Sequence, residues 1–284
     1  MRKIFFIFVL CLSSLSAGAF EISEGFVYSK DFWQNNVAVS QDINYMLNVG
    51  LNFDIAEHDD ISHHIYTFSL PLMFRTERFG LYLRPFIVPD NANDASAYGA
   101  KASLTLNIKH DEVDNSSSSV FLSAGFANQN AYVTKVGLGS QKEDFKQMVY
   151  EGGLVFDYFD TYFFEISGNM FDYISGISDV ENVAGVLDQQ NIASLDTLNY
   201  VLSLPKSSIG AKIKWNSEAS QSSNTISYKY IEFKEHDISP HHSVMFSTLV
   251  MLKYNLYINL AYNHIFISSQ KDKDIFKGAI SLKF

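Results

Sequence analysis

Six of the eight histidines lie in two similar stretches, EHDDISHH at residues 57–64 and EHDISPHH at residues 235–242. Imidazole and carboxylate groups suit Zn²⁺, Cu²⁺ and Ni²⁺. The stretches therefore predict a transition-metal site with the candidate ligands His58, His63, His64, His236, His241 and His242. Adjacent histidines in an extended segment point to opposite faces, so one ion would need ligands from elsewhere in its stretch or from both stretches.

A duplicated hairpin explains the same similarity without a ligand. The match continues beyond both stretches, where Phe68 corresponds to Phe246 and Met73 to Met251. Both interpretations stay open at this point, and they share one requirement. The segments that flank the histidines must form strands.

Polar and apolar residues alternate through much of the chain. Between residues 43 and 54, Ile43, Tyr45, Leu47, Val49, Leu51 and Phe53 alternate with mostly polar neighbours. The segments 97–109, 148–158, 161–170, 208–216 and 256–264 repeat the pattern. Strands in soluble sheets are usually about five or six residues long, whereas a tilted membrane strand needs about 9–11. The lengths therefore favour a transmembrane barrel over a soluble sandwich.

Residues 1–19 have the pattern of a secretory signal peptide, with two basic residues, an apolar run and the small residues Ala17-Gly18-Ala19. Cleavage before Phe20 would remove Cys11, the only cysteine, so the mature chain could form neither a disulfide nor a thiolate metal site. The formal net charge of −10 disfavours nucleic acid as a partner. Beyond the signal, no apolar run reaches the roughly 18 residues that a membrane helix needs.

The chain ends in DIFKGAISLKF, with Phe276, Ile280 and Leu282 on the same strand face as Phe284. This resembles the C-terminal signature of Gram-negative outer-membrane β-barrels, in which a terminal Phe and alternating apolar residues are read by the barrel-assembly machinery. The resemblance implies an outer-membrane location in a Gram-negative bacterium, with outer-membrane lipid and the assembly machinery as partners. The chain length is similar to that of monomeric fourteen-stranded porins, which implies a monomer.

We therefore expect an all-β fold, a closed antiparallel transmembrane β-barrel of about 14 strands, with 12 as the alternative. Thirteen segments read as strands, including separate strands at 118–128 and 131–139, and single-chain bacterial barrels have an even number. The missing strand is 20–30 or 197–204. Residues 1–19 form the signal peptide, 20–42 an N-terminal segment or first strand, and 43–284 the barrel. The segment 171–196 is an extracellular loop able to fold into the mouth, or a periplasmic segment.

The polar strand faces predict the lining of the lumen. Its charged candidates are Arg84, Lys101, Lys135, Lys212, Lys214, Lys229, Lys253, Lys277, Glu151, Asp157 and Glu165. Most other acidic residues fall in turns, and rings of Lys and Arg favour negative solutes. We expect a porin-like channel for small hydrophilic solutes with a weak anion preference. The alternative is a non-conducting barrel whose loops bind a partner, a surface ligand or a divalent metal, and whose lumen charges only pair with one another.

No catalytic motif supports an enzyme. Outer-membrane phospholipases carry a His-x-Ser-Asn-Gly run on a strand, and His242-Ser243 lacks both its spacing and its flanking residues. His264 stands alone, and the chain has no Gly-x-Ser-x-Gly elbow, His-Glu-x-x-His helix or phosphate loop. We expect no enzymatic activity and no cofactor, apart from the possible divalent transition metal in the loops.

Overall fold

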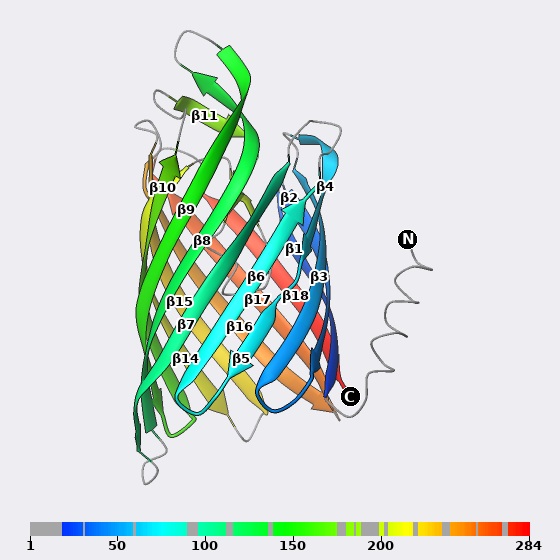
Figure 1. The fold of residues 1–284 in the computed structure, drawn as a ribbon, viewed down its shortest axis with the longest axis vertical. Helices are drawn as coiled ribbons and strands as arrows, with labels where there is room; N and C mark the ends of the chain where they lie inside the picture. Colours follow the sequence, from blue (N-terminus) through cyan, green and yellow to red (C-terminus); the bar gives the residue numbers. More distant parts are fainter. Residues whose placement is uncertain are drawn as a thin grey trace.

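The computed structural model describes residues 19–30, 32–58, 61–89, 96–111, 116–135, 139–174, 180–184, 186–188, 199–201, 204–217, 221–234, 239–253, 255–268 and 272–284. They form a closed antiparallel β-barrel of fourteen strands, shown in Figure 1. The predicted fold class is confirmed. Within the described residues, no helix is long and apolar enough to cross a membrane.

The first half of the wall contains β1 (Phe20–Ser29), β2 (Phe32–Asp42), β3 (Leu47–His58), β4 (Ile61–Ser69), β5 (Leu72–Arg75), β6 (Phe79–Val88), β7 (Ala97–Asp111) and β8 (Ser116–Lys135). The second half contains β9 (Gly139–Tyr158), β10 (Tyr162–Ile174), β14 (Pro205–Ser217), β15 (Ser222–Phe233), β16 (His241–Lys253), β17 (Leu256–Ile267) and β18 (Lys273–Lys283). Three short strands lie outside this wall, namely β11 (Val180–Ala184), β12 (Val186–Asp188) and β13 (Asn199–Val201).

The wall closes where β1 pairs with β18. The amide of Phe284 donates to the carbonyl of Phe20 at 2.7 Å, and the amide of Phe20 donates back at 3.2 Å. Closure leaves no open sheet edge toward lipid, which is a condition for a sheet to span a bilayer. The short strands β4 and β5 follow each other in the chain and together act as one wall strand, which pairs with β3 on one side and with β6 on the other.

Two strand predictions differ from the structure. Residues 20–42 form two wall strands, β1 and β2, rather than a segment or a single strand. The alternation of β2 is hidden because polar residues such as Gln34, Asn35 and Asn36 occupy both of its faces. The separate strand at 131–139 is wrong, because β8 and β9 are two continuous strands of 20 residues each, and they form one hairpin that extends from the wall into the space above it. Residues 199–201 pair as β13 with β12, outside the wall.

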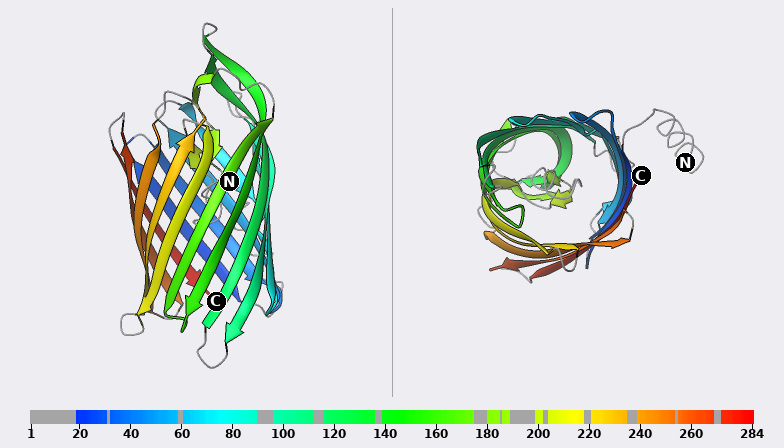
Figure 2. Two further views of the ribbon diagram at one scale, coloured as in Figure 1. Left: turned by 90° about the vertical axis from the view of Figure 1, so that its left-hand side faces the viewer. Right: turned by 90° about the horizontal axis from the view of Figure 1, so that it is seen from below.

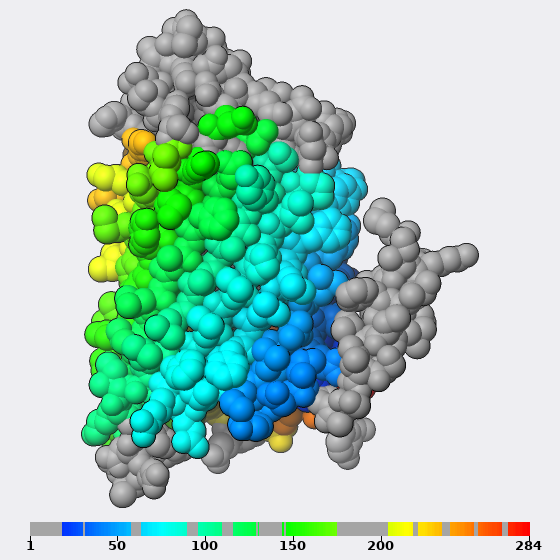
Figure 3. Space-filling view, in the orientation of Figure 1, coloured from blue at the N-terminus to red at the C-terminus, as the bar shows by residue number. Residues whose placement is uncertain are grey.

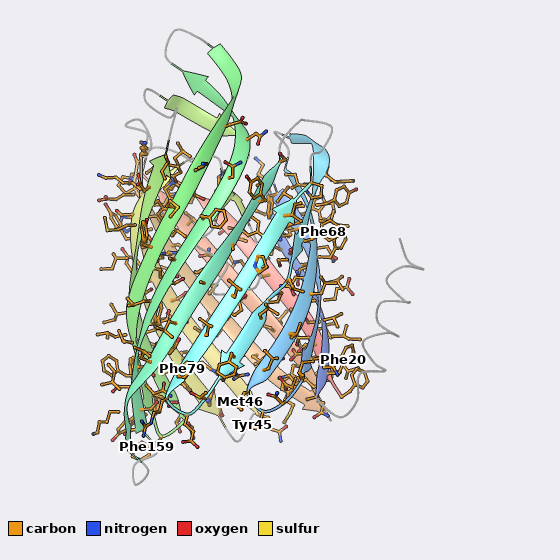
Figure 4. All side chains as sticks on the ribbon, viewed as in Figure 1. Phe20, Tyr45, Met46, Phe68, Phe79 and Phe159 are labelled. Carbon is orange, nitrogen blue, oxygen red and sulfur yellow. The ribbon has the colours of Figure 1, made fainter. Side chains whose placement is uncertain are left out.

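The two faces of the wall follow the predicted alternation. Large apolar side chains point outward at mid-wall and remain exposed, for example Ile166, Ile213 and Leu260. Aromatic side chains mark both rims, with Phe20, Phe79 and Phe159 toward the end where the described chain begins and ends, here called the end with the termini, and Phe68 toward the other end (Figure 4). The side chains of β3 to β9 make a continuous outer surface (Figure 3). An apolar band between aromatic girdles is the outer surface that a membrane barrel presents to lipid.

The β8–β9 hairpin rises above the other strands at the end opposite the termini, and β11 pairs with it there, as Figure 1 shows. In the view along the barrel axis, β12 and β13 lie inside the outline of the wall (Figure 2). The short strands β12 and β13, which lie between β10 and β14 in the sequence, are therefore placed at the mouth of the barrel. This agrees with the loop alternative predicted for 171–196, although much of that segment lies outside the described residues.

Candidate functional site: the barrel lumen

The interior of the barrel holds a cavity of about 670 Å³, lined by residues of β5 to β10 and β14 to β18. Most of the residues that line the cavity are polar or charged. This follows from the strand pattern, because every second residue of each strand points inward. The lining has five cations and two carboxylates, which are Arg75, Lys101, Lys212, Lys229, Lys277, Glu151 and Glu165. This cavity is the candidate functional site.

The more buried of two ion pairs among the described lumen residues joins β7 to β9 across β8. Lys101 Nζ lies 2.7 Å from Glu151 Oε2, and the two side chains are 3% and 11% exposed. The registers place Gly125 and Ser123 of β8 between them. These small residues leave room for the lysine to reach across a strand. The pair is removed from solvent, so its charges are held by each other rather than by water.

A second pair joins β10 to β14 directly. Lys212 Nζ lies 2.5 Å from Glu165 Oε2, and the two residues are register partners. Their side chains are 37% and 26% exposed, so water screens this pair more than the first. Both carboxylates of the cavity are thus engaged by lysines of the same wall.

Two further charged residues are buried in the wall of β2 to β6. Asp54 Oδ1 accepts hydrogen bonds from Gln34 Nε2 at 3.0 Å and from Asn36 Nδ2 at 2.8 Å. Arg84 is fully buried and its Nε donates to Ser69 Oγ at 3.0 Å. Arg84 was predicted to line the pore, whereas Asp54 was missed. The signal for Asp54 was present, since it continues the polar face of residues 43–54.

The other predicted lumen residues divide into two groups. Lys214 and Asp157 face inward near the end with the termini, where Lys214 Nζ lies 4.7 Å from the centre of the Phe163 ring. They do not line the large cavity. The side chains of Lys135 and Lys253 lie outside the described residues, and their placement stays a prediction.

The histidine stretches emerge at the same end of the barrel, opposite the termini, which is the arrangement that a shared site requires. In the wall, however, β2, β1, β18 and β17 separate β3 from β16. His64 Nδ1 lies 3.2 Å from Glu57 Oε2, and His242 Nδ1 lies 2.7 Å from the Tyr228 hydroxyl.

No cluster of three or more histidine, cysteine or acidic side chains suited to a metal occurs among the described residues. His236 and the side chains of His58 and His63 lie outside them, and His241 packs edge-on against Phe233 with the ring centres 4.4 Å apart. The metal site stays a prediction.

Comparison with known proteins supports the fold alone. No family model and no curated protein matches the chain. Among solved structures, the CymD monoaromatic hydrocarbon channel aligns with a TM-score of 0.54 and 9% identity, covering 96% of this chain and 89% of CymD.

Two other barrels align less closely. OccK11 of Pseudomonas aeruginosa has a TM-score of 0.47 and 11% identity, with 94% and 95% of the two chains covered. CdiB from Acinetobacter baumannii has a TM-score of 0.49 and 8% identity, and the alignment covers 95% of this chain but spans 60% of the length of CdiB.

The wall, its apolar outer face and its charged interior are those of a Gram-negative outer-membrane β-barrel. This is the class that the C-terminal resemblance implies.

Proposed function

We propose that the protein is a non-enzymatic channel of the outer membrane that lets small hydrophilic solutes pass, with a weak preference for anions. The observation that carries the proposal is the charge of the lumen, where five cations and two carboxylates line one cavity. The excess of positive charge lowers the electrostatic barrier for a negative solute and raises it for a positive one. The CymD monoaromatic hydrocarbon channel has a similar fold.

The preference should be weak because much of the lumen charge is compensated. Lys101 and Lys212 already hold the carboxylates of Glu151 and Glu165. Arg84 and Asp54, both buried in the wall, carry opposite charges and together add no net charge to it. Five cations less two carboxylates leave an excess of three positive charges on the described lining, so the net field that a solute meets is small. Salt in the lumen screens such a field over a Debye length of about 8 Å at physiological ionic strength.

Reversal potentials of single channels in a planar bilayer, measured across a salt gradient, test the proposal. The wild-type protein should conduct with a potential on the anion-selective side. Lys229→Gln and Lys277→Gln should each move the potential toward zero, because each removes one lumen cation. Lys146→Gln is the matched control, since Lys146 is exposed on the outer face of β9. A cation-selective wild type, or a control that shifts as much as the lumen variants, would refute the anion preference.

A second candidate function is a non-conducting barrel that binds a partner through its loops. The placement of β12 and β13 within the outline of the wall favours it, because this small sheet takes up part of the mouth. A folded, heat-modifiable sample that shows no single-channel steps would support this function and overturn the channel.

A further inference from the structure

Glu24 is a feature of the outer surface that the channel function does not explain. It lies in β1 on the outward face, between Ile22 and Phe26, and it is exposed. Its register partners are Val37 of β2 and Ile280 of β18, and Ile280 is 54% exposed. The carboxyl group therefore sits among apolar side chains that face lipid.

The depth of Glu24 makes its position costly. Phe20, four residues earlier, lies at the rim with the termini, and its ring centre is 6.1 Å from that of Phe284. Tyr28, four residues later, pairs with Trp33 toward the opposite rim. Glu24 is thus at mid-wall, and within the described strands no other outward-facing carboxylate lies at this depth. A charged group on the lipid face of a barrel is most destabilising near the middle of the bilayer.

A polar neighbour accompanies Glu24 on this face. Asn35 of β2 also points outward, and its Nδ2 donates to Glu24 Oε1 at 3.4 Å. One long hydrogen bond leaves further acceptor sites on the carboxylate and a further donor on the amide. Acyl chains can satisfy neither group, because they offer no hydrogen-bond partner.

The surface beside this pair is shallow. Gly278 of β18 faces outward without a side chain, and the ring of Phe26 lies over it, where a Cβ would overlap the ring. Close packing of a flat neighbour is therefore possible at Glu24. A partner that reaches this depth must itself span the membrane and must carry both a donor and an acceptor.

We propose that Glu24 and Asn35 form the centre of a two-fold symmetric contact between two copies of this chain within the membrane, in place of the monomer expected from chain length. A patch that holds an acceptor and a donor side by side is complementary to itself after half a turn about the membrane normal. The two polar atoms are only 3.4 Å apart, so they lie at nearly the same depth. Asn35 of each copy can then donate to the partner's Glu24.

Cysteine cross-linking tests this contact. Cys11 belongs to the predicted signal peptide, so a mature chain with one introduced cysteine can form only an intermolecular disulfide. Oxidation of Val37→Cys in isolated outer membranes should give a covalent dimer on a denaturing gel. Ile213→Cys is the matched control, because Ile213 is a 44% exposed outward residue of β14, on a distant part of the ring. It should give little or no dimer.

Removal of the polar pair provides the second arm. Glu24→Leu in the Val37→Cys background should reduce the covalent dimer at least fivefold while heat-modifiable mobility shows that the barrel still folds. If Glu24 simply faces lipid in a monomer, Val37→Cys will cross-link no more than Ile213→Cys, or Glu24→Leu will leave the dimer band unchanged. Either result overturns the proposal. Neither readout depends on conductance, so the outcome is independent of the channel function.

Discussion

The buried pair Lys101–Glu151 allows a quantitative test of how the lumen is held together. Glu151→Gln removes the carboxylate from a lysine whose side chain is 3% exposed. Breaking a buried ion pair by removing one partner costs about 3–5 kcal/mol, because the remaining charge is left without compensation. We expect a loss in this range in the free energy of unfolding. The pair at Lys212–Glu165 is the internal comparison.

Glu165→Gln changes the same chemical group in the same wall, but its lysine is 37% exposed. Water can solvate Lys212 after the substitution, and exposed pairs contribute about 0.2–1 kcal/mol. The structure therefore predicts at least a threefold ratio between the two losses. A third variant, Lys101→Met with Glu151→Leu, removes both charges together and should recover most of the stability that Glu151→Gln loses.

Urea titration of the folded barrel in micelles gives these free energies, with the fluorescence of Trp33 and Trp215 and the gel mobility of the folded form as two probes. Coincident transitions by both probes are needed before a two-state analysis is applied. Equal losses for Glu151→Gln and Glu165→Gln would refute the argument from burial. So would a double variant that is less stable than Glu151→Gln alone.

Three further outcomes can be checked on the same protein. Gly278→Val should lower the free energy of unfolding by about 1–3 kcal/mol in urea, because its side chain overlaps the ring of Phe26, and Phe26→Ala should relieve the loss; an unchanged midpoint speaks against this packing. Deleting Phe284 should reduce the folded form in outer membranes, since both hydrogen bonds that end the seam are lost; normal levels would contradict this. Calorimetric titration with Zn²⁺ should give no heat if the histidine stretches are only duplicated hairpins, whereas heat that vanishes when His64 and His242 become Ala identifies a metal site.

Alternation was a sufficient guide wherever one strand face is apolar. Segments such as 97–109 and 208–216 were assigned correctly because lipid requires an apolar outer face and water permits a polar inner one. The terminal Phe284 indicated where the wall ends, and the structure pairs it with Phe20. The inward direction of Lys101, Lys212 and Glu165 followed from the same parity.

The remainder depended on interactions that one strand cannot reveal. β2 was missed because Asn35 interrupts its outward face, and the hydrogen-bond partner of Asn35, Glu24, lies on β1. The burial of Arg84 was not predictable from the alternation of the strand. Alternation tells whether a side chain points into or out of the barrel, but not whether an inward side chain is buried against the wall or reaches the solvent of the lumen. The partners of Asp54 come from β2, whose register was unknown. The extension of β8 beyond the wall was hidden because a strand above the membrane has no lipid to impose alternation.

The seam between Phe20 and Phe284 also has consequences for how the barrel folds and for how its chain can be rearranged. These residues are far apart in sequence yet hydrogen-bonded, so the closing contact spans nearly the whole chain and is slow to form. Until then, β1 and β18 are both open edges that can pair with other chains. Once the predicted signal peptide is removed, the adjacent ends make the molecule suited to circular permutation. Joining Phe284 to Phe20 through a short turn and opening the chain at another hairpin would move the last-formed seam to a different pair of strands.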